Sequence, residues 1–105
     1  MILTTTDSIP NKKIAEILGV VRGNTVRARW FGRDIAAGLK HFVGGEIKSY
    51  TDMLTQSRDQ AVKRMEEEAK KLGADAVINL RFTTSDVMQG SAEMLAYGTA
   101  VKFKK

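Results

Sequence analysis

Residues 49–73 read SYTDMLTQSRDQAVKRMEEEAKKLG, and their apolar and small residues recur at steps of three and four. The recurring positions are Tyr50, Met53, Leu54, Ser57, Ala61, Met65, Ala69 and Leu72. The charged residues lie on the other faces, so the pattern predicts one long amphipathic helix with a narrow apolar stripe. Ser49 can cap its start, with Asp52 as the third residue of the helix, and Gly73 can end it at the C′ position.

Two strands are predicted after this helix. Residues 76–84 alternate: Ala76, Ile78, Leu80 and Phe82 point one way, and Val77, Asn79, Arg81 and Thr83 point the other. Residues 85–91 are predicted to form a loop around Gly90, followed by a strand over residues 92–103. One face of that strand carries the small set Met94, Ala96, Gly98 and Ala100. Another element could therefore pack closely against it.

The segment before the helix predicts more strands and a second, shorter helix. Residues 2–5 form a short strand candidate, and residues 8–11 form a turn around the only proline. Residues 13–29 predict either two strands or one long strand with a bulge at Gly19, turning at Gly23-Asn24. Residues 33–43 predict a short helix that Gly44-Gly45 ends.

These elements predict one α+β domain over residues 1–105, with a small antiparallel or mixed sheet packed on one long helix plus a short helix. The long helix can cover only one face of that sheet. The apolar residues left on the other face would form a patch larger than monomers usually expose. The sequence therefore favours a homo-oligomer.

Composition indicates the cellular compartment of the protein and the class of its binding partner. The chain has no cysteine, no apolar run behind a basic start, and no stretch of 18 apolar residues. We therefore expect a cytoplasmic protein without disulfides, signal peptide or membrane span. The net charge of +5 is compatible with a nucleic-acid partner. The charges are dispersed, however, and those of the long helix nearly balance, which is typical of a solvated helix face.

Several motifs, in this order, resemble the YbjQ family of small bacterial and archaeal proteins, once labelled heavy-metal-binding. The motifs are Ile17 to Gly23, Gly32-Arg33-Asp34-Ile35, Gly44-Gly45-Glu46, Tyr50 with Arg58 and Ala61, Gly73 to Ile78, and Ala96 to Val101. The resemblance covers nearly the whole chain. It implies a β/α subunit assembled into a ring-shaped homopentamer, without an established activity.

The residues themselves do not favour a heavy-metal site. Copper(I) and zinc prefer thiolate, thioether or imidazole ligands. The chain offers one histidine, His41, and five methionines in no close cluster. Met53 and Met65 belong to the apolar stripe, where methionine is ordinary core filler. We therefore expect no metal site and no cofactor. A hard ion held by Asp34 and Glu46 across subunits is left open.

One polar set is the candidate site for a small ligand. It consists of Arg33, Asp34, Glu46, Tyr50 and Arg58. Asp34 would lie in the first turn of the short helix, where the helix dipole favours a carboxylate. Glu46 follows two glycines that permit a close backbone approach. The alternative is that these residues cap helices and form arginine–carboxylate pairs across a subunit interface, without any ligand.

No catalytic constellation is expected. The serines lack a histidine at credible distance, since any triad would rest on His41 alone. The leading hypothesis is a non-enzymatic oligomer that binds a small ligand or ion at subunit interfaces. The alternative is a weak nucleic-acid-binding protein that acts through a basic face, because Trp30-Phe31 lies among arginines.

Overall fold

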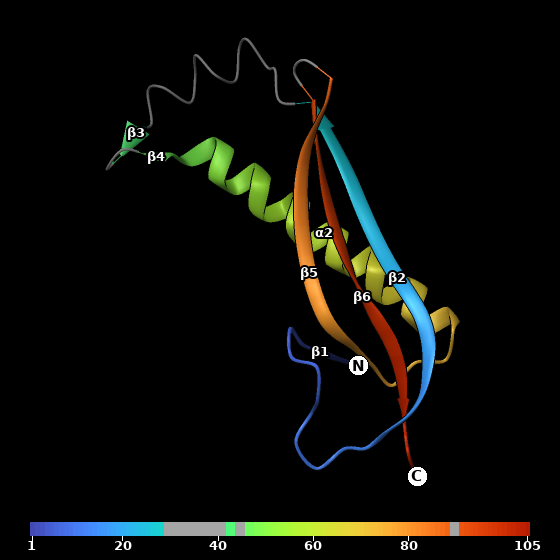
Figure 1. The fold of residues 1–105 in the computed structure, drawn as a ribbon. Helices are drawn as coiled ribbons and strands as arrows, with labels where there is room; N and C mark the ends of the chain where they lie inside the picture. Colours follow the sequence, from blue (N-terminus) through green and yellow to red (C-terminus); the bar gives the residue numbers. More distant parts are fainter. Residues whose placement is uncertain (29–41, 44–45, 89–90) are drawn as a thin grey trace.

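The computed structural model describes residues 1–28, 42–43, 46–88 and 91–105. A four-stranded mixed sheet has the order β1-β5-β6-β2, and the helix α2 (Lys48–Lys71) packs on one of its faces (Figure 1). The strands are β1 (Ile2–Leu3), β2 (Ile14–Ala28), β5 (Ala76–Met88) and β6 (Ser91–Phe103). A separate two-stranded pair joins β3 (Phe42–Val43) to β4 (Glu46–Ile47). The α+β class predicted from the sequence is confirmed.

The long helix has the predicted C-terminal end. Gly73 adopts a φ of +77°, and its N–H donates to the carbonyl of Lys70. The N–H of Ala74 donates to the carbonyl of Ala69, which completes a glycine-based helix end. The predicted start is wrong, because α2 begins at Lys48 and Ser49 is already helical. Leu72 follows the helix and is 47% exposed, so it does not extend the buried stripe.

The segment Ile14–Ala28 is one long strand. It pairs antiparallel with β6 along its length, and the register shifts between Ile17 and Gly19. Gly19 has a φ of +132°, so the predicted bulge at this glycine is confirmed. The turn proposed at Gly23-Asn24 is wrong, since the strand runs straight through both residues.

Gly23 serves the contact between strand and helix. A Cβ atom at this position would collide with the backbone of α2 at Ala61 and Met65, and would lie 2.8 Å from the Cβ of Arg64. The missing side chain therefore allows the helix backbone to rest directly on β2. The surrounding core combines Val21, Val77 and Leu80 with alanine and methionine, namely Ala61, Met65, Ala69, Met94, Ala96 and Ala100. The prediction that another element packs closely on the small face of β6 is confirmed.

The strict alternation predicted for residues 76–84 fails at Asn79. This residue has a φ of +53°, and the pairing with β6 shifts between Ile78 and Arg81. As a result, Val77 and Leu80 belong to the core under α2, whereas Ile78 packs on the opposite face. The loop predicted from residue 85 is also wrong, because β5 continues to Met88.

Two further predictions concern the N-terminal half. The strand expected at residues 2–5 is present as the shorter β1, and Ile9 bridges Lys12 across the expected turn. Most of the predicted short helix lies outside the described residues. Its last two residues, Phe42 and Val43, form β3 instead.

The contact at Gly23 yields a stability prediction. In the variant Gly23→Ala, the added methyl group must push α2 away from β2, which should lower the free energy of unfolding by about 2 kcal/mol or more. Chemical denaturation monitored by circular dichroism measures this loss. The control Glu16→Ala changes an exposed residue of the same strand and should cost less than about 0.5 kcal/mol. Equal stability of Gly23→Ala and the parent chain would contradict the role assigned to this glycine.

Candidate functional site

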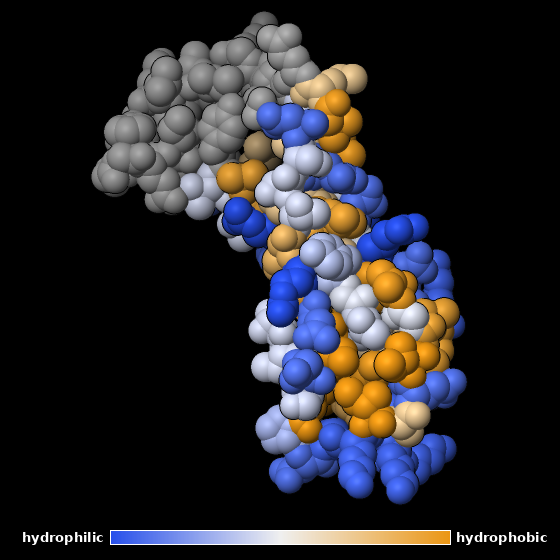
Figure 2. Space-filling model, in the orientation of Figure 1, coloured by the Kyte–Doolittle hydropathy of each residue, from blue (hydrophilic) through white to orange (hydrophobic). Residues whose placement is uncertain are grey.

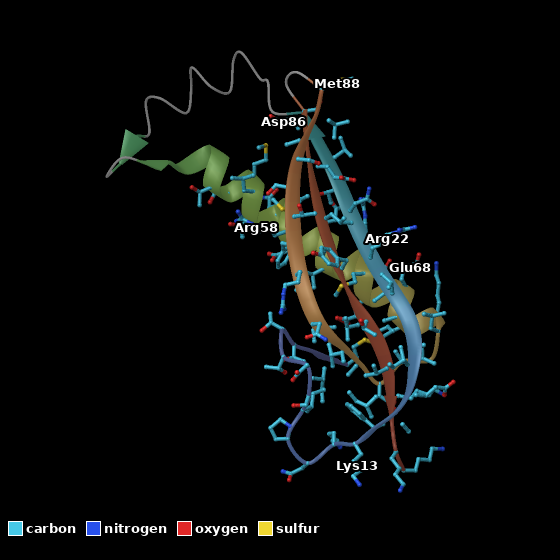
Figure 3. The ribbon with its side chains drawn as sticks, viewed as in Figure 1. Lys13, Arg22, Arg58, Glu68, Asp86 and Met88 are labelled. Carbon is cyan, nitrogen blue, oxygen red and sulfur yellow. The ribbon has the colours of Figure 1, made fainter. Side chains whose placement is uncertain are left out.

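Of the five candidate residues, the structure fully describes only Arg58. Arg33 and Asp34 lie outside the described residues. Glu46 belongs to β4 and Tyr50 to the first turn of α2, but their side chains are also outside the description. Arg58 is exposed on α2 and has no ion-pair partner among the described residues (Figure 3). Eight positions separate Tyr50 from Arg58, so the helix spaces them about 12 Å apart along its axis.

The polar groups buried under the helix are engaged within the fold. The hydroxyl of Thr25 donates to the carbonyl of Ser57 at 3.3 Å. The hydroxyl of Ser57 donates in turn to the carbonyl of Met53, one helical turn earlier, at 2.9 Å. Among the described residues, no buried side-chain nitrogen or oxygen lacks a hydrogen-bond partner. These groups hold the helix on the strand rather than facing a ligand.

A shallow pocket lies between the first half of α2 and the sheet. It is lined by Met53, Leu54, Ser57, Thr84, Ala92, Glu93 and Met94. Its wall is almost entirely apolar. The carboxylate of Glu93 accepts a hydrogen bond from the side-chain amide of Asn24 at 3.1 Å, and the hydroxyl of Ser57 is used within the helix. The pocket therefore supplies apolar contact but no aligned set of polar groups for a ligand or a reaction.

The most unusual surface is the sheet face opposite α2, here called the outer face. On β2, Val21, Gly23 and Thr25 are buried under the helix, so the alternate residues point away from it. The outward-pointing Val20 is 75% exposed, and Ile17, before the bulge, is 70% exposed. The sequence interpretation missed these side chains because Ile17 and Val20 are three positions apart, and simple alternation would place them on opposite faces. The bulge at Gly19 brings both to one face.

Tyr97 stands at the centre of the outer face. Its position on β6 is opposite Arg22 on β2 and Arg81 on β5, so the three form a row across the sheet. Tyr97 is 38% exposed, and the guanidinium of Arg81 donates to the carbonyl of Thr5 at 2.9 Å.

Among the described residues, another segment covers the outer face only at its lower end. There Ala76, Ile78 and Val101 form a small buried cluster with Ile9, Ile14 and Phe103 against it. The N-terminal segment thus closes this end, and Lys12 places its ammonium 5.5 Å from the centre of the Phe103 ring. Figure 2 views this face, with apolar side chains gathered over the lower half of the strands. The outer face therefore combines an apolar area with a short basic and aromatic row.

Comparisons with known proteins agree on the relationships of the chain. The YbjQ_1 family model, described as "Putative heavy-metal-binding", matches residues 1–104. A UPF0145 protein of Archaeoglobus fulgidus is 62% identical over 104 residues, covering 99% of this chain and 96% of the relative. A UPF0145 protein of Thermosipho africanus is 59% identical over 105 residues, covering 100% of this chain and 97% of the relative.

The fold also matches a solved structure. A protein of unknown function from the DUF74 family of Pediococcus pentosaceus superposes with a TM-score of 0.72 at 23% identity. The match covers 99% of this chain and 98% of the other. At that identity the likeness concerns the fold alone. No helix among the described residues is long and apolar enough to cross a membrane.

The side chains available as metal ligands lead to a prediction about metal binding. The chain has no cysteine and one histidine, and the described residues contain no group of three histidine, aspartate or glutamate side chains that could hold an ion. After dialysis against zinc or cadmium at micromolar free ion, we expect well under one equivalent per subunit, because soft metals require thiolate or imidazole ligands. Elemental analysis measures this ratio, and a stoichiometric, chelator-resistant metal would contradict the expectation.

Proposed function

The chain belongs to the YbjQ family, and we propose that it is a non-enzymatic cytoplasmic protein that assembles with copies of itself into a closed ring. The observation that carries the proposal is the outer face, on which Ile17, Val20 and Tyr97 are exposed and have no cover from the described segments. Covering a valine or isoleucine side chain that is mostly in water is worth about 1 kcal/mol or more. A second copy of the chain would recover this free energy at every interface of the ring.

The family resemblance favours five subunits in the ring. A head-to-tail contact repeated by rotation closes and leaves no copy of the interface open. Within such a ring, Arg33, Asp34, Glu46, Tyr50 and Arg58 are proposed to lie at subunit interfaces, where they could bind a small ligand or ion. Arg58 supports this part because it is exposed on α2 without an ion-pair partner among the described residues.

Light scattering tests the assembly directly. At micromolar concentration the parent chain should have a mass near five subunits of 11.6 kDa. The variant Val20→Asp places a charge in the apolar outer face and should reduce the mass to that of smaller species or cause aggregation, because burying an unpaired carboxylate is costly. The control Thr55→Asp introduces the same charge at an exposed position of α2 and should keep the parent mass. A folded parent chain of 11.6 kDa would contradict the proposal.

Nucleic-acid binding is the alternative function. The observation that favours it is the row of Arg22, Tyr97 and Arg81 across the outer face, since aromatic and arginine side chains can stack on unpaired bases. The two proposals compete for the same surface, because a face buried between subunits is not available to a nucleic acid.

Salt dependence separates the alternatives. If the chain contacts a few phosphates through dispersed arginines and lysines, its affinity for single-stranded DNA should fall on the order of tenfold or more between 50 and 200 mM salt. Fluorescence anisotropy with a labelled oligonucleotide measures this loss, and oligonucleotides of different sequence should behave alike. A sequence-selective complex that resists salt would place nucleic-acid binding above assembly as the function.

A further inference from the structure

Among the described residues, no strand pairs with the upper half of β5 along one of its two edges. Within the sheet, β5 lies between β1 and β6, but β1 pairs only with Ala76 and Val77. The N-terminal segment adds three backbone hydrogen bonds, from Thr4 to Val77, from Asn79 to Thr6 and from Leu80 to Thr4. Beyond Leu80, no described strand pairs with this edge. Residues 81–88 are all exposed, and Asp86 and Met88 stand at the upper end of the strand (Figure 3).

At the other side of the sheet, the part of the chain that the structure describes also offers no partner strand. The strand β2 is the last in the order, and its ladder to β6 occupies only one of its edges. One carbonyl of β2 is engaged at mid-strand, where the guanidinium of Arg64 donates to Asn24 at 2.6 Å. The part of β2 that precedes Asn24 pairs with no other described strand along this edge.

Both edges lack two of the residue types that usually prevent strand pairing, lysine and proline, although the bulge at Gly19 lies within the β2 edge. Natural edge strands are protected by charged side chains, above all lysine, and by proline, bulges or short length. Residues 81–88, RFTTSDVM, contain no lysine and no proline, and neither do residues 14–24 of β2. Apolar side chains flank both edges instead: Phe82, Val87 and Met88 are 44%, 52% and 64% exposed, and Ile17 and Val20 are more exposed still. Left in water, such edges would promote open-ended aggregation.

We propose that Arg81–Met88 of β5 pairs with the part of β2 that precedes Asn24 in a second copy of this chain, so that the sheets of neighbouring subunits become continuous. This inference rests on the proposed self-assembly and specifies its contact. Pairing β5 with β2 uses both open edges of every subunit, whereas pairing β5 with another β5 would leave every β2 edge open.

The topology also fixes the direction of the pairing. Both β2 and β5 run antiparallel to β6, so they run parallel to each other within one subunit. Rotation about an axis along the strands preserves strand direction, and the contact between subunits is therefore parallel. In this arrangement, the last turns of α2, which extend past β2 in Figure 1, would lie behind the incoming strand.

Engineered cysteines test the contact, because the natural chain has none. Ser85→Cys on β5 is combined in turn with Ile17→Cys, Val20→Cys and Arg22→Cys on β2, all at exposed positions. Side chains of paired strands approach closely enough for a disulfide only near the correct register. After mild oxidation, at least one pair should give a ladder of dimer, trimer and larger species on non-reducing gels.

Controls separate the alternatives. Ser85→Cys combined with Lys63→Cys, an exposed position of α2, should give no ladder. Dimers from Ser85→Cys alone would indicate β5 pairing with β5 and would overturn the inference. Absence of a ladder from all three pairs, with light scattering still showing an assembled protein, would refute the edge contact but not the assembly. A monomeric mass for the parent chain would refute both.

Discussion

The contact between the backbone of α2 and β2 at Gly23 is the constraint on which the rest of the structure depends. Because Gly23 has no side chain, the helix rests directly on the strand at Ala61 and Met65. Alanines on α2 and on the neighbouring strand β6, including Ala69, Ala96 and Ala100, keep this layer thin and are fully buried. This close packing holds α2 over β2 and β6. The helix makes few contacts with β5. The remainder of the sheet must therefore be covered by another segment or by another molecule.

That requirement connects the fold to the proposed function. The N-terminal segment covers the lower end of the outer face with Ile9, and β1 covers the lower edge of β5. The remaining outer face and the edge beyond Leu80 have no cover among the described residues. A second copy of the chain can supply apolar contact for the face and a strand for the edge at once. Self-assembly then completes the sheet. The ligand that the polar candidate residues bind between subunits is a separate question.

The sequence predicted the elements whose signals are local. The helix end at Gly73 and the bulge at Gly19 were confirmed because each depends on a glycine with positive φ. Sequence reasoning failed where tertiary contact decides. Gly23-Asn24 has the composition of a turn, yet Gly23 is required by the helix that crosses it. The irregularity at Asn79 moves Ile78 and Leu80 to opposite faces, which strict alternation could not anticipate. Of the candidate site, only Arg58 can be placed with its side chain.

Amide hydrogen exchange within Arg81–Met88, followed over a dilution series, tests the central claim that a second copy completes the sheet. In the assembled protein, alternate amides of this segment should be protected, because they donate to the neighbouring strand. At dilutions where light scattering reports a monomer, the protection should be lost, while the amides of β6 stay protected within the subunit. Rapid exchange throughout Arg81–Met88 at every concentration, including those at which the protein is assembled, would contradict the account.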